Sequence, residues 1–424
     1  MLVVIRSAWP LLLGMLMLMV GNGLQGTLLG VRGQVAEFST MTMSIIMSAY
    51  FVGFLGGSKL APKMIARVGH VRVFAALGSA ISAVLILYPA LVEPWAWILG
   101  RVIIGFCFSG VYVTAESWLN NATTNETRGQ ALSLYMIVQM GGIVGAQYLL
   151  LIDDPSGYLL FIIPSVLVSL AFAPILLSVS PTPAFDTTAP MNLRGLIETS
   201  PLASVGMVLL GAVFAAQFGM SAVYASQIGL GIGQISVFVS AIYISALIMQ
   251  YPIGWLSDRM DRRLLVIGIA AFAGAGALLT FLLPSTFTTV LIGAAIIGGT
   301  SNPLYALLLA YANDHLEHHE MASASAGFVF INGVGAIMGP LAVGWLIGTI
   351  GPEGFWLFIS VPMLLLALYG LYRITQRDSS WIAGEAVSYA PVLASSSPVA
   401  VEVAQEVYID AETESAEMAE DAGH

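Results

Sequence analysis

The most constraining feature of the sequence is a charged stretch, residues 254–263, that follows one long apolar run and precedes another. The two runs, Ser236–Trp255 and Leu264–Leu283, contain no charged residue. About 20 mostly apolar residues are enough for a helix to cross the hydrocarbon core of a bilayer. We therefore interpret residues 254–263 as a tight polar turn between two membrane helices. Its three arginines predict a cytoplasmic location, because short basic loops resist translocation.

Apolar runs of this kind recur along most of the chain, with short polar breaks between them. Of the 424 residues 58% are hydrophobic and only 9% are charged, whereas a soluble protein carries about a quarter charged residues. The alternating pattern of an outer-membrane barrel strand is absent. We predict an all-α membrane protein with twelve transmembrane helices. The predicted spans are Ala8–Val31, Met41–Ile65, Val73–Leu91, Trp95–Leu119, Gly129–Ile152, Tyr158–Val179, Ala203–Ser226, Ser236–Trp255, Leu264–Leu283, Thr288–Tyr311, Ala322–Thr349 and Gly354–Tyr372.

The basic residues predict the orientation of the whole chain. With both termini in the cytoplasm, 12 of the 14 basic residues lie on the cytoplasmic side, and Arg32 and Arg101 are the exceptions. The opposite orientation would leave almost every basic loop outside, against the positive-inside rule. We expect a multi-pass protein of the cell inner membrane with both termini cytoplasmic. The cytoplasmic set is Arg6, Lys59, Lys63, Arg67, Arg72, Arg128, Arg194, Arg259, Arg262, Arg263, Arg373 and Arg377.

Polar segments divide the chain into two six-helix halves, residues 1–179 and 203–375. The proline-rich segment between them, 180–202, is predicted to be a cytoplasmic linker. Ten acidic residues follow Arg377 and account for the whole net charge of −10. We expect this C-terminal region, 376–424, to be a disordered acidic tail, because it has few large apolar residues with which to form a core.

The two halves are related by an internal repeat. Gly100–Gly105 corresponds to Gly293–Gly298 with an offset of 193 residues, and Gly57 corresponds to Gly254 with an offset of 197 residues. Similar offsets at separate places indicate duplication. Each half contains an even number of spans, so the halves share one orientation and are parallel repeats. Parallel repeats of membrane helices are typical of one large class of secondary transporters.

The turn after the eighth span carries a family signature. Its residues match the pattern Gly-x-Leu-x-Asp-Arg-x-x-Arg-Arg, by which the chain resembles the major facilitator superfamily over roughly residues 8–375. The overall pattern is most similar to a little-studied bacterial branch of that superfamily. The resemblance implies two halves that rock about a midplane cavity, which is transport by alternating access without enzyme chemistry. The matching residues are Gly254, Leu256, Asp258, Arg259, Arg262 and Arg263.

Only two charged residues lie clearly within a span, Arg101 and Glu116, both in the fourth. A charged side chain in hydrocarbon costs on the order of 3 kcal/mol or more, so each needs a partner or a wet cavity. They are 15 residues apart, or about 22 Å along a helix, and cannot pair. Both are candidate coupling residues, since Arg101-x-x-x-Gly105 resembles the span 4 motif that the superfamily links to proton coupling.

Each coupling candidate also has a structural interpretation. Arg101 could instead be satisfied by carbonyl groups or extend its charge to the membrane surface. Glu116 could form a structural salt bridge with Lys63, Arg67 or Arg128, because it lies only one or two turns from the polar loop that follows. Both interpretations stay open at this point.

The signature turn supplies candidate gating residues. Ion pairs there could hold the cytoplasmic side shut and break when the protein opens inward. Asp258 is expected to meet the N-terminal end of span 11 or a basic neighbour. The alternative is that the turn only anchors the topology. The gating candidates are Asp258, Arg259, Arg262 and Arg263.

The resemblance implies that spans 1, 4, 7 and 10 surround the cavity. Polar and aromatic residues on these spans are the candidate substrate-binding residues, and uncharged amides with aromatic rings suit a neutral or amphipathic solute. Hydrogen bonding between helices is the alternative interpretation for each of them. The candidates are Asn22, Gln25, Tyr112, Gln217, Tyr224, Asn302 and Tyr305. Supporting residues on other spans are Tyr50, Gln139, Tyr243, Gln250 and Asn332.

No catalytic or nucleotide-binding motif is present, so we expect neither an enzyme nor a self-contained ATP-driven pump. No cofactor, metal or nucleic acid is implied; the expected partners are a small-molecule solute, protons and the lipid bilayer, with the protein a monomer. The first hypothesis is a secondary active transporter that exports a small amphipathic compound in exchange for protons. The alternatives are an importer of a small nutrient, such as a sugar, amino acid or organic acid, and a non-transporting membrane sensor that signals through its tail.

Overall fold

The computed structural model describes residues 2–121, 123–176, 193–316, 318–376, 389, 391–407 and 409. Within these residues the chain forms twelve long helices and one short helix, α7, and each predicted span corresponds to one long helix. Eleven of the long helices are long and apolar enough to cross a membrane, and α6 contributes a shorter apolar segment, Leu159–Pro174. The helices are α1 (Leu2–Val35), α2 (Thr40–Val68), α3 (His70–Ala90), α4 (Pro94–Asn121), α5 (Asn125–Leu149), α6 (Leu159–Leu176), α7 (Leu193–Thr199), α8 (Pro201–Gln227), α9 (Ile232–Ser257), α10 (Arg262–Leu282), α11 (Phe287–Asn313), α12 (His318–Ile350) and α13 (Gly354–Ile374).

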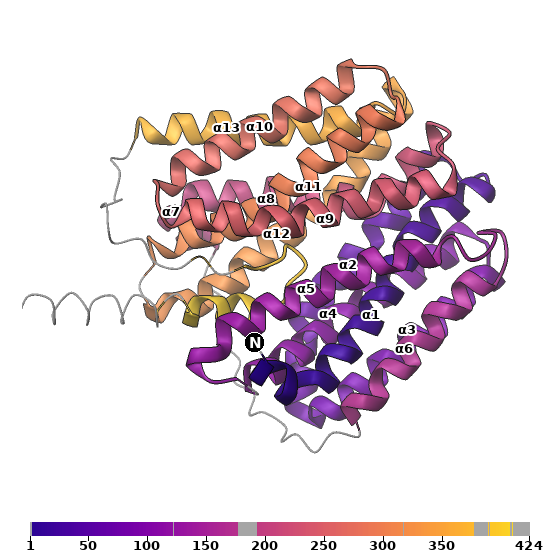
Figure 1. Ribbon diagram of the computed structural model, residues 1–424, viewed down its shortest axis with the longest axis horizontal. Coiled ribbons are helices and arrows are strands. Elements are labelled where there is room, and N and C mark those ends of the chain that lie inside the picture. The colour runs from indigo at the N-terminus through magenta and orange to yellow at the C-terminus, as the bar shows by residue number, and fades with distance from the viewer. Residues whose placement is uncertain are drawn as a thin grey trace, which may run out of the picture.

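The helices pack as two similar halves, α1–α6 and α8–α13, which Figure 1 shows in indigo to magenta and in red to orange. Each main contact within the first half has a counterpart in the second: α2 packs on α4 as α9 packs on α11, α1 on α5 as α8 on α12, and α3 on α6 as α10 on α13. The predicted fold of two parallel six-helix repeats is therefore confirmed. The short helix α7 lies in the segment that the sequence predicts to be a linker.

The repeated glycine motif explains one of these paired contacts. A Cβ atom on Gly105 would overlap the carbonyl oxygen of Tyr50, and a Cβ atom on Gly298 would overlap that of Ile242. At both positions only glycine lets the two helix backbones approach this closely. The offset of 193 residues between Gly105 and Gly298 thus marks equivalent crossings of α4 on α2 and of α11 on α9.

The two ends of the helix bundle differ in composition. One end, here named the basic end, carries the ends of α2, α4 and α9 and the start of α10, with Lys59, Lys63, Arg128 and the signature turn. The other, here named the opposite end, carries the connections from α1 to α2 and from α8 to α9. At the opposite end the halves touch directly: Gln227 donates to the Thr40 hydroxyl at 2.6 Å.

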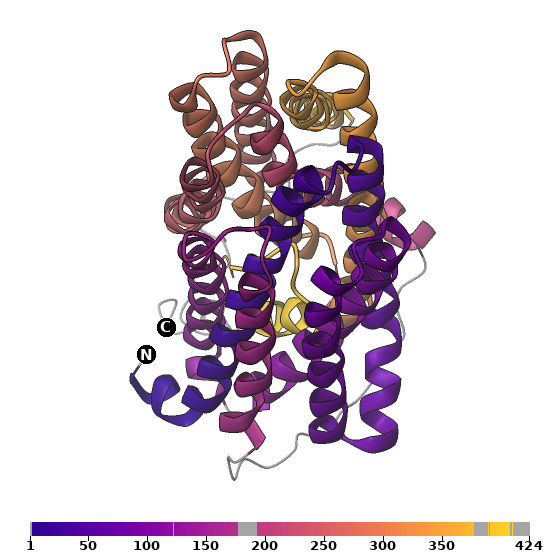
Figure 2. The same cartoon turned by 90° about the vertical axis from the view of Figure 1, so that its right-hand side faces the viewer.

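At the basic end a part of the C-terminal region lies between the halves. It comprises residues 389 and 391–407, here named the tail segment, and it is helical over residues 398–407 (Figure 2, yellow). The sequence predicts a disordered tail over residues 376–424, whereas the structure describes the tail segment packed against the bundle. Small apolar side chains are sufficient here because Val392, Val401 and Val403 are buried against the core of the bundle and need not form a core of their own. The remainder of the predicted tail lies outside the described residues.

Candidate functional site

A cavity lies between the two halves. Helices of both halves and the tail segment line it, and no charged side chain is among the lining residues that the structure describes. Most of the wall is aromatic or aliphatic. The lining residues are Asn22, Tyr50, Phe51, Phe54, Leu55, Ser58, Tyr112, Met140, Ile143, Phe214, Phe218, Tyr243, Asn302, Val329, Asn332, Gly333, Ala336, Leu393, Ala394 and Ser395.

Aromatic rings from α2 and α8 form a continuous cluster across the boundary between the halves. The ring of Phe218 stacks on that of Phe214 with centroids 6.0 Å apart, and it lies 5.4 Å from the ring of Tyr50. Phe51 contacts both phenylalanines edge-on. Such rings combine a large apolar area with preferred stacking geometries, so this wall favours a flat or apolar surface of a bound molecule.

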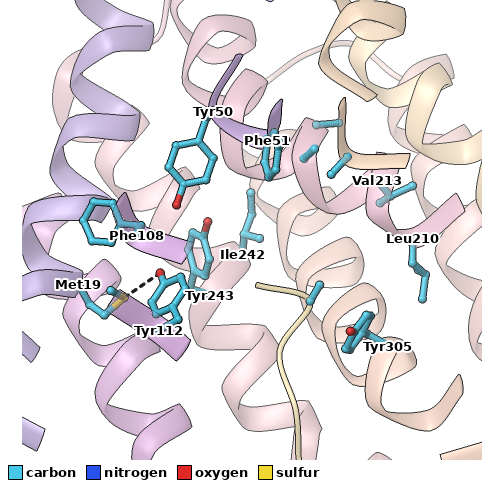
Figure 3. Packing of buried hydrophobic residues seen from close by; sticks show 14 of the residues in the cluster. Met19, Tyr50, Phe51, Phe108, Tyr112, Leu210, Val213, Ile242, Tyr243 and Tyr305 are labelled. Carbon is cyan, nitrogen blue, oxygen red and sulfur yellow. Dashed lines mark hydrogen bonds between the residues drawn. The ribbon is translucent and has the colours of Figure 1, made fainter. Parts of the chain in front are cut away.

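The polar groups of the cavity form a chain that leads to a buried charge. Figure 3 shows the hydroxyl groups of Tyr50, Tyr112 and Tyr243 directed toward one region between the halves. The Asn22 amide donates to the Tyr112 hydroxyl at 3.3 Å, and Gln25 donates to the Asn22 carbonyl oxygen at 3.2 Å. Gln25 in turn accepts a hydrogen bond of 3.1 Å from Arg101. The Asn22 amide is therefore held in a fixed orientation by a fully buried network.

Arg101 itself is buried behind the cavity wall, with 0% of its surface exposed. Besides Gln25 it contacts the Met47 sulfur at 3.5 Å, and its guanidinium lies 4.7 Å from the centre of the Tyr50 ring. Among the described residues no carboxylate pairs with it. An amide, a sulfur and an aromatic face thus replace the ion pair that a charge in hydrocarbon usually requires, since a ring face attracts a desolvated cation.

The seven predicted substrate-binding residues separate into two groups. Asn22, Tyr112 and Asn302 line the cavity, and Gln25 supports them from behind. The remaining three are buried away from the lining. Gln217 exchanges hydrogen bonds with Ser301 of α11, which is the interhelical role considered as the alternative. Tyr224 stacks on Phe355 at 4.9 Å.

Tyr305 is the third residue away from the lining, and it is fully buried. Figure 3 shows it apart from the cluster of hydroxyl groups around Tyr112. Three of the supporting residues, Tyr50, Tyr243 and Asn332, do line the cavity. Gln139 is buried elsewhere. Gln250 donates to the hydroxyl of Tyr389 in the tail segment at 2.6 Å.

Glu116 binds the tail segment and not a basic residue of the polar loop. Its carboxylate accepts hydrogen bonds from the Ser397 hydroxyl, from the backbone N–H of Ser397 at 3.2 Å and from that of Ala400 at 3.3 Å. The Tyr135 hydroxyl donates at 3.3 Å. Among the described residues none of the expected salt bridges to Glu116 forms. The basic candidate nearest in sequence, Arg128, pairs with Glu406 at 2.9 Å.

Among the described residues, three of the four predicted gating residues, Arg259, Arg262 and Arg263, contact residues of the second half. Arg262 pairs with Asp314 at the end of α11 and lies 3.9 Å from Asp258. Arg263 pairs with Asp261 at 3.3 Å. Arg259 lies over the Trp255 ring, 4.3 Å from its centre.

Asp258 differs from the other three gating residues, because its carboxylate also accepts the backbone N–H of Tyr389 at 3.0 Å. Burial raises the pKa of the Asp258 carboxyl, while the hydrogen bond from Tyr389 and the charge of Arg262 lower it in part. Among the described residues the structure shows no contact from Asp258 to the start of α12. Its partners are a basic neighbour, as expected, and the tail segment.

Comparison with known proteins supplies the family. The family model of the Major Facilitator Superfamily matches residues 11–231 and 202–404 of the chain. The chain belongs to the major facilitator superfamily. Curated relatives include the "Uncharacterized MFS-type transporter YcaD" of Salmonella heidelberg (strain SL476), which is 26% identical over 345 residues, 79% of this chain and 87% of the relative. The protein of the same name from Salmonella typhi is 25% identical over 381 residues, 88% of this chain and 97% of the relative.

Solved structures share the superfamily fold at low sequence identity. The nucleoside transporter NupG has a TM-score of 0.69 and 16% identity, and the match covers 89% of this chain and 100% of that one. A bacterial homologue of the human lysosomal transporter Spinster, in an inward-facing and occupied conformation, has a TM-score of 0.67 and 16% identity, with 87% and 98% covered. Together these findings show a multi-pass membrane transporter of the superfamily.

Sequence reasoning missed most of the aromatic wall. It took its binding candidates from spans 1, 4, 7 and 10 and only supporting residues, such as Tyr50, from other spans, whereas α2 also supplies Phe51 and Phe54 and α5 supplies Met140. A signal was present, because Phe214 and Phe218 are four residues apart and lie on one helical face. Nothing in that search included the tail segment, which contributes Leu393 to the lining.

Proposed function

We propose that this member of the superfamily is a secondary active transporter of a small, uncharged or amphipathic solute with a flat apolar part. The observation that carries the proposal is the cavity wall, in which aromatic rings of both halves surround the amides of Asn22, Asn302 and Asn332 and no lining side chain in the described part of the chain is charged. An ionised solute would lose its hydration there without gaining a partner, at a cost of several kcal/mol, whereas a neutral one would not.

Alternating access follows from where the wall residues come from. Tyr50 and Phe51 belong to the first half, and Phe214 and Phe218 belong to the second. A solute held between them contacts both halves at once, so its binding energy changes when the halves rock. The conformation in this structure is closed at the opposite end. In alternating access it interconverts with a conformation that is open at that end. The proposal places the basic end and both termini in the cytoplasm, as the positive-inside rule favours.

The experiment is a ligand screen followed by transport. Purified protein is heated with a panel of neutral probes that includes uridine, glucose and an amphipathic dye, and a stabilising probe is then tested for uptake in proteoliposomes. Phe218→Ala should weaken its binding about tenfold, since a lost aromatic pair and its buried area amount to about 1.4 kcal/mol or more. Phe272→Ala on α10 is the matched control, because that ring is 59% exposed on the outer surface of the bundle. Equal affinity of both variants for the probe would contradict the proposal that the probe binds in this cavity.

Proton-coupled export is the finer form of the proposal. Glu116 supports it as the one acidic residue inside a predicted span, and Arg101 supports it as a buried charge one hydrogen bond from Gln25 and two from Asn22. Flux of the same probe is measured with and without an imposed pH gradient, for the parent protein and for Glu116→Gln. A gradient should accelerate the parent protein and leave Glu116→Gln unchanged. Flux that ignores the gradient in both proteins would contradict proton coupling and would leave facilitated import of a nutrient as the remaining form.

A further inference from the structure

We propose that the mouth of the cavity at the basic end is a binding site for the chain's own tail segment, and that the bound segment blocks passage at this end. The inference concerns a peptide ligand and does not depend on which solute is transported. It rests on three groups of contacts that the tail segment makes with the bundle.

The first group is a helix cap supplied from outside the tail. Ser397 directly precedes the helix of the tail segment, and Pro398 is its first residue. Serine is preferred at the N-cap of a helix and proline at its first position. In an ordinary capping box an acidic residue three places later accepts the backbone N–H of the serine. Here that place is Ala400, and Glu116 of α4 accepts the N–H groups of both Ser397 and Ala400. A negative carboxylate at a helix start is favoured by the helix dipole. Glu116 therefore recognises the folded, capped form of the tail segment.

The second group ties the same segment to the other half of the bundle. Asn332 of α12 donates to the Ala394 carbonyl oxygen at 3.0 Å. Gln405 accepts from the Ser325 hydroxyl of α12 and donates to Asn313 of α11 at 2.9 Å. These are side-chain amides and hydroxyls buried with matching partners. Because Glu116 lies in the first half and these residues lie in the second, the tail segment bridges the halves.

The third group lies at the signature turn. The Tyr389 hydroxyl accepts from Gln250 at 2.6 Å and donates to the Pro303 carbonyl oxygen at 3.4 Å, while its backbone N–H donates to Asp258. Its ring lies against Gly254, where a Cβ atom would come within 2.6 Å of the ring. Two signature residues, Gly254 and Asp258, thus form part of a tyrosine pocket. In this proposal the signature turn contributes to gating by holding Tyr389 of the tail segment.

Occupancy of the cavity is what makes the contact inhibitory. Leu393, Ala394 and Ser395 line the cavity itself and share its wall with Asn332 and Ser58. Leu393 is only 5% exposed and Val392 only 2%, so the segment fills the mouth and is not laid over it. A solute cannot pass the basic end while the segment is bound. Release of the segment is therefore a required step of transport at this end.

The test measures the accessibility of the cavity and needs no transported solute. In a Cys107→Ala background, Ser58→Cys reports on the cavity through its rate of reaction with a sulfonated, water-soluble maleimide. Full-length protein is compared with a chain that ends at Gln376 and with Ser397→Ala in the full-length chain. Both changes should raise the rate, the truncation by about tenfold or more, because protection reflects the fraction of molecules in which the site is covered. Ser79→Ala on α3 is the matched control: its hydroxyl donates to the Ala75 carbonyl oxygen of the same helix, away from the tail segment, and its rate should equal that of the parent.

A peptide of residues 389–407 completes the test. Added to the truncated protein at about 1 mM, the effective concentration that a short linker provides, it should restore protection. A peptide with Ser397→Ala should restore less. Equal labelling of full-length and truncated protein would overturn the proposal. So would a fast truncated protein that the peptide leaves unprotected, or full protection in Ser397→Ala if the truncated chain fails to fold. These expected labelling rates do not depend on the proposed solute, so they would stay the same if no solute of that class were transported.

Discussion

The two ends of the cavity are closed in different ways. At the opposite end helix packs on helix across the halves: Gly30 lies where an added Cβ atom would come within 2.8 Å of Ala222, and Gly219 lies where one would come within 2.9 Å of Met47. At the basic end the halves are bridged by the tail segment, through Glu116 on one side and Asn332 on the other. One closure is made of helix surfaces and the other of a peptide.

This difference decides what each end needs in order to open. Small residues let helix backbones approach, and a contact of that kind is lost only when whole helices move apart. A peptide held by side-chain hydrogen bonds can leave while the helices stay in place. The opposite end is therefore expected to respond to helix packing, and the basic end to the sequence of the tail.

The largest expected effect comes from overpacking the closure at the opposite end. A Cβ atom on Gly344 of α12 would overlap Ser44 of α2, so Gly344→Leu should force the halves apart there. Overpacking costs about 1–3 kcal/mol, which corresponds to a shift of about fivefold to a hundredfold toward a state open at this end. The shift is measured as a longer distance between spin labels at Glu37→Cys, in the connection from α1 to α2, and Gly233→Cys, in the first turn of α9.

Gly348→Leu is the matched control for that experiment. It changes the same helix one turn later, at an exposed position where an added Cβ atom would meet nothing within 4 Å. Its distance distribution should equal that of the parent protein. An unchanged distribution in Gly344→Leu would contradict the view that packing closes this end.

A smaller effect is expected from the ion pairs of the signature turn, and it should fall on stability and leave the closure intact. Arg262 is 5% exposed and pairs with Asp314, and both residues lie in the second half. Asp314→Asn leaves a buried guanidinium short of its carboxylate, so we expect a loss of about 2 kcal/mol and a melting temperature lower by several degrees. The labelling rate of Ser58→Cys should not change, because the ion pair that is lost lies within the second half.

The matched control is a pair on the surface. Arg194 and Glu198 lie 2.8 Å apart, but their side chains are 85% and 65% exposed. Glu198→Gln should leave the melting temperature of the protein nearly unchanged, as exposed pairs contribute little. Faster labelling in Asp314→Asn would instead support the original hypothesis that the turn itself is the gate.

The same contrast separates what the sequence could predict from what it could not. Length and hydrophobicity are local properties, so all twelve helices and the two-half arrangement followed from apolar runs and from the repeat at Gly105 and Gly298. The candidate site was predicted in part. Asn22, Tyr112 and Asn302 line the cavity, because polar residues inside apolar runs mark an interior face.

The contacts that the sequence could not predict share one physical cause, which is that the partner of a residue lies far away in the chain. Gln217 was a candidate for the cavity, with hydrogen bonding between helices as the alternative, and it binds Ser301 of α11. Glu116 was interpreted either as a coupling residue or as the partner of a basic residue, and it caps a helix that begins 281 residues later at Ser397. The tail segment was expected to be disordered because it cannot form a core alone. A buried segment needs no core of its own when the bundle supplies one, and the Ser397-Pro398 start was its visible signal.

The smallest expected effect tests how much the polar contacts add to the closure at the opposite end. Gln227 of α8 donates to the Thr40 hydroxyl of α2 at 2.6 Å, in a partly buried position between the halves. Thr40→Val keeps the shape of the side chain and removes the acceptor, which should cost about 0.5–1.5 kcal/mol because water can reach Gln227 when the halves separate. With the same pair of spin labels, the open state should gain at most about tenfold, less than in Gly344→Leu. Ser79→Ala is the control, since its hydroxyl bonds only within α3, to the Ala75 carbonyl oxygen at 2.9 Å. If Thr40→Val opened the protein as far as Gly344→Leu does, side-chain hydrogen bonds would hold the opposite end closed, as they hold the tail segment at the basic end. The distinction between the two closures would then fail.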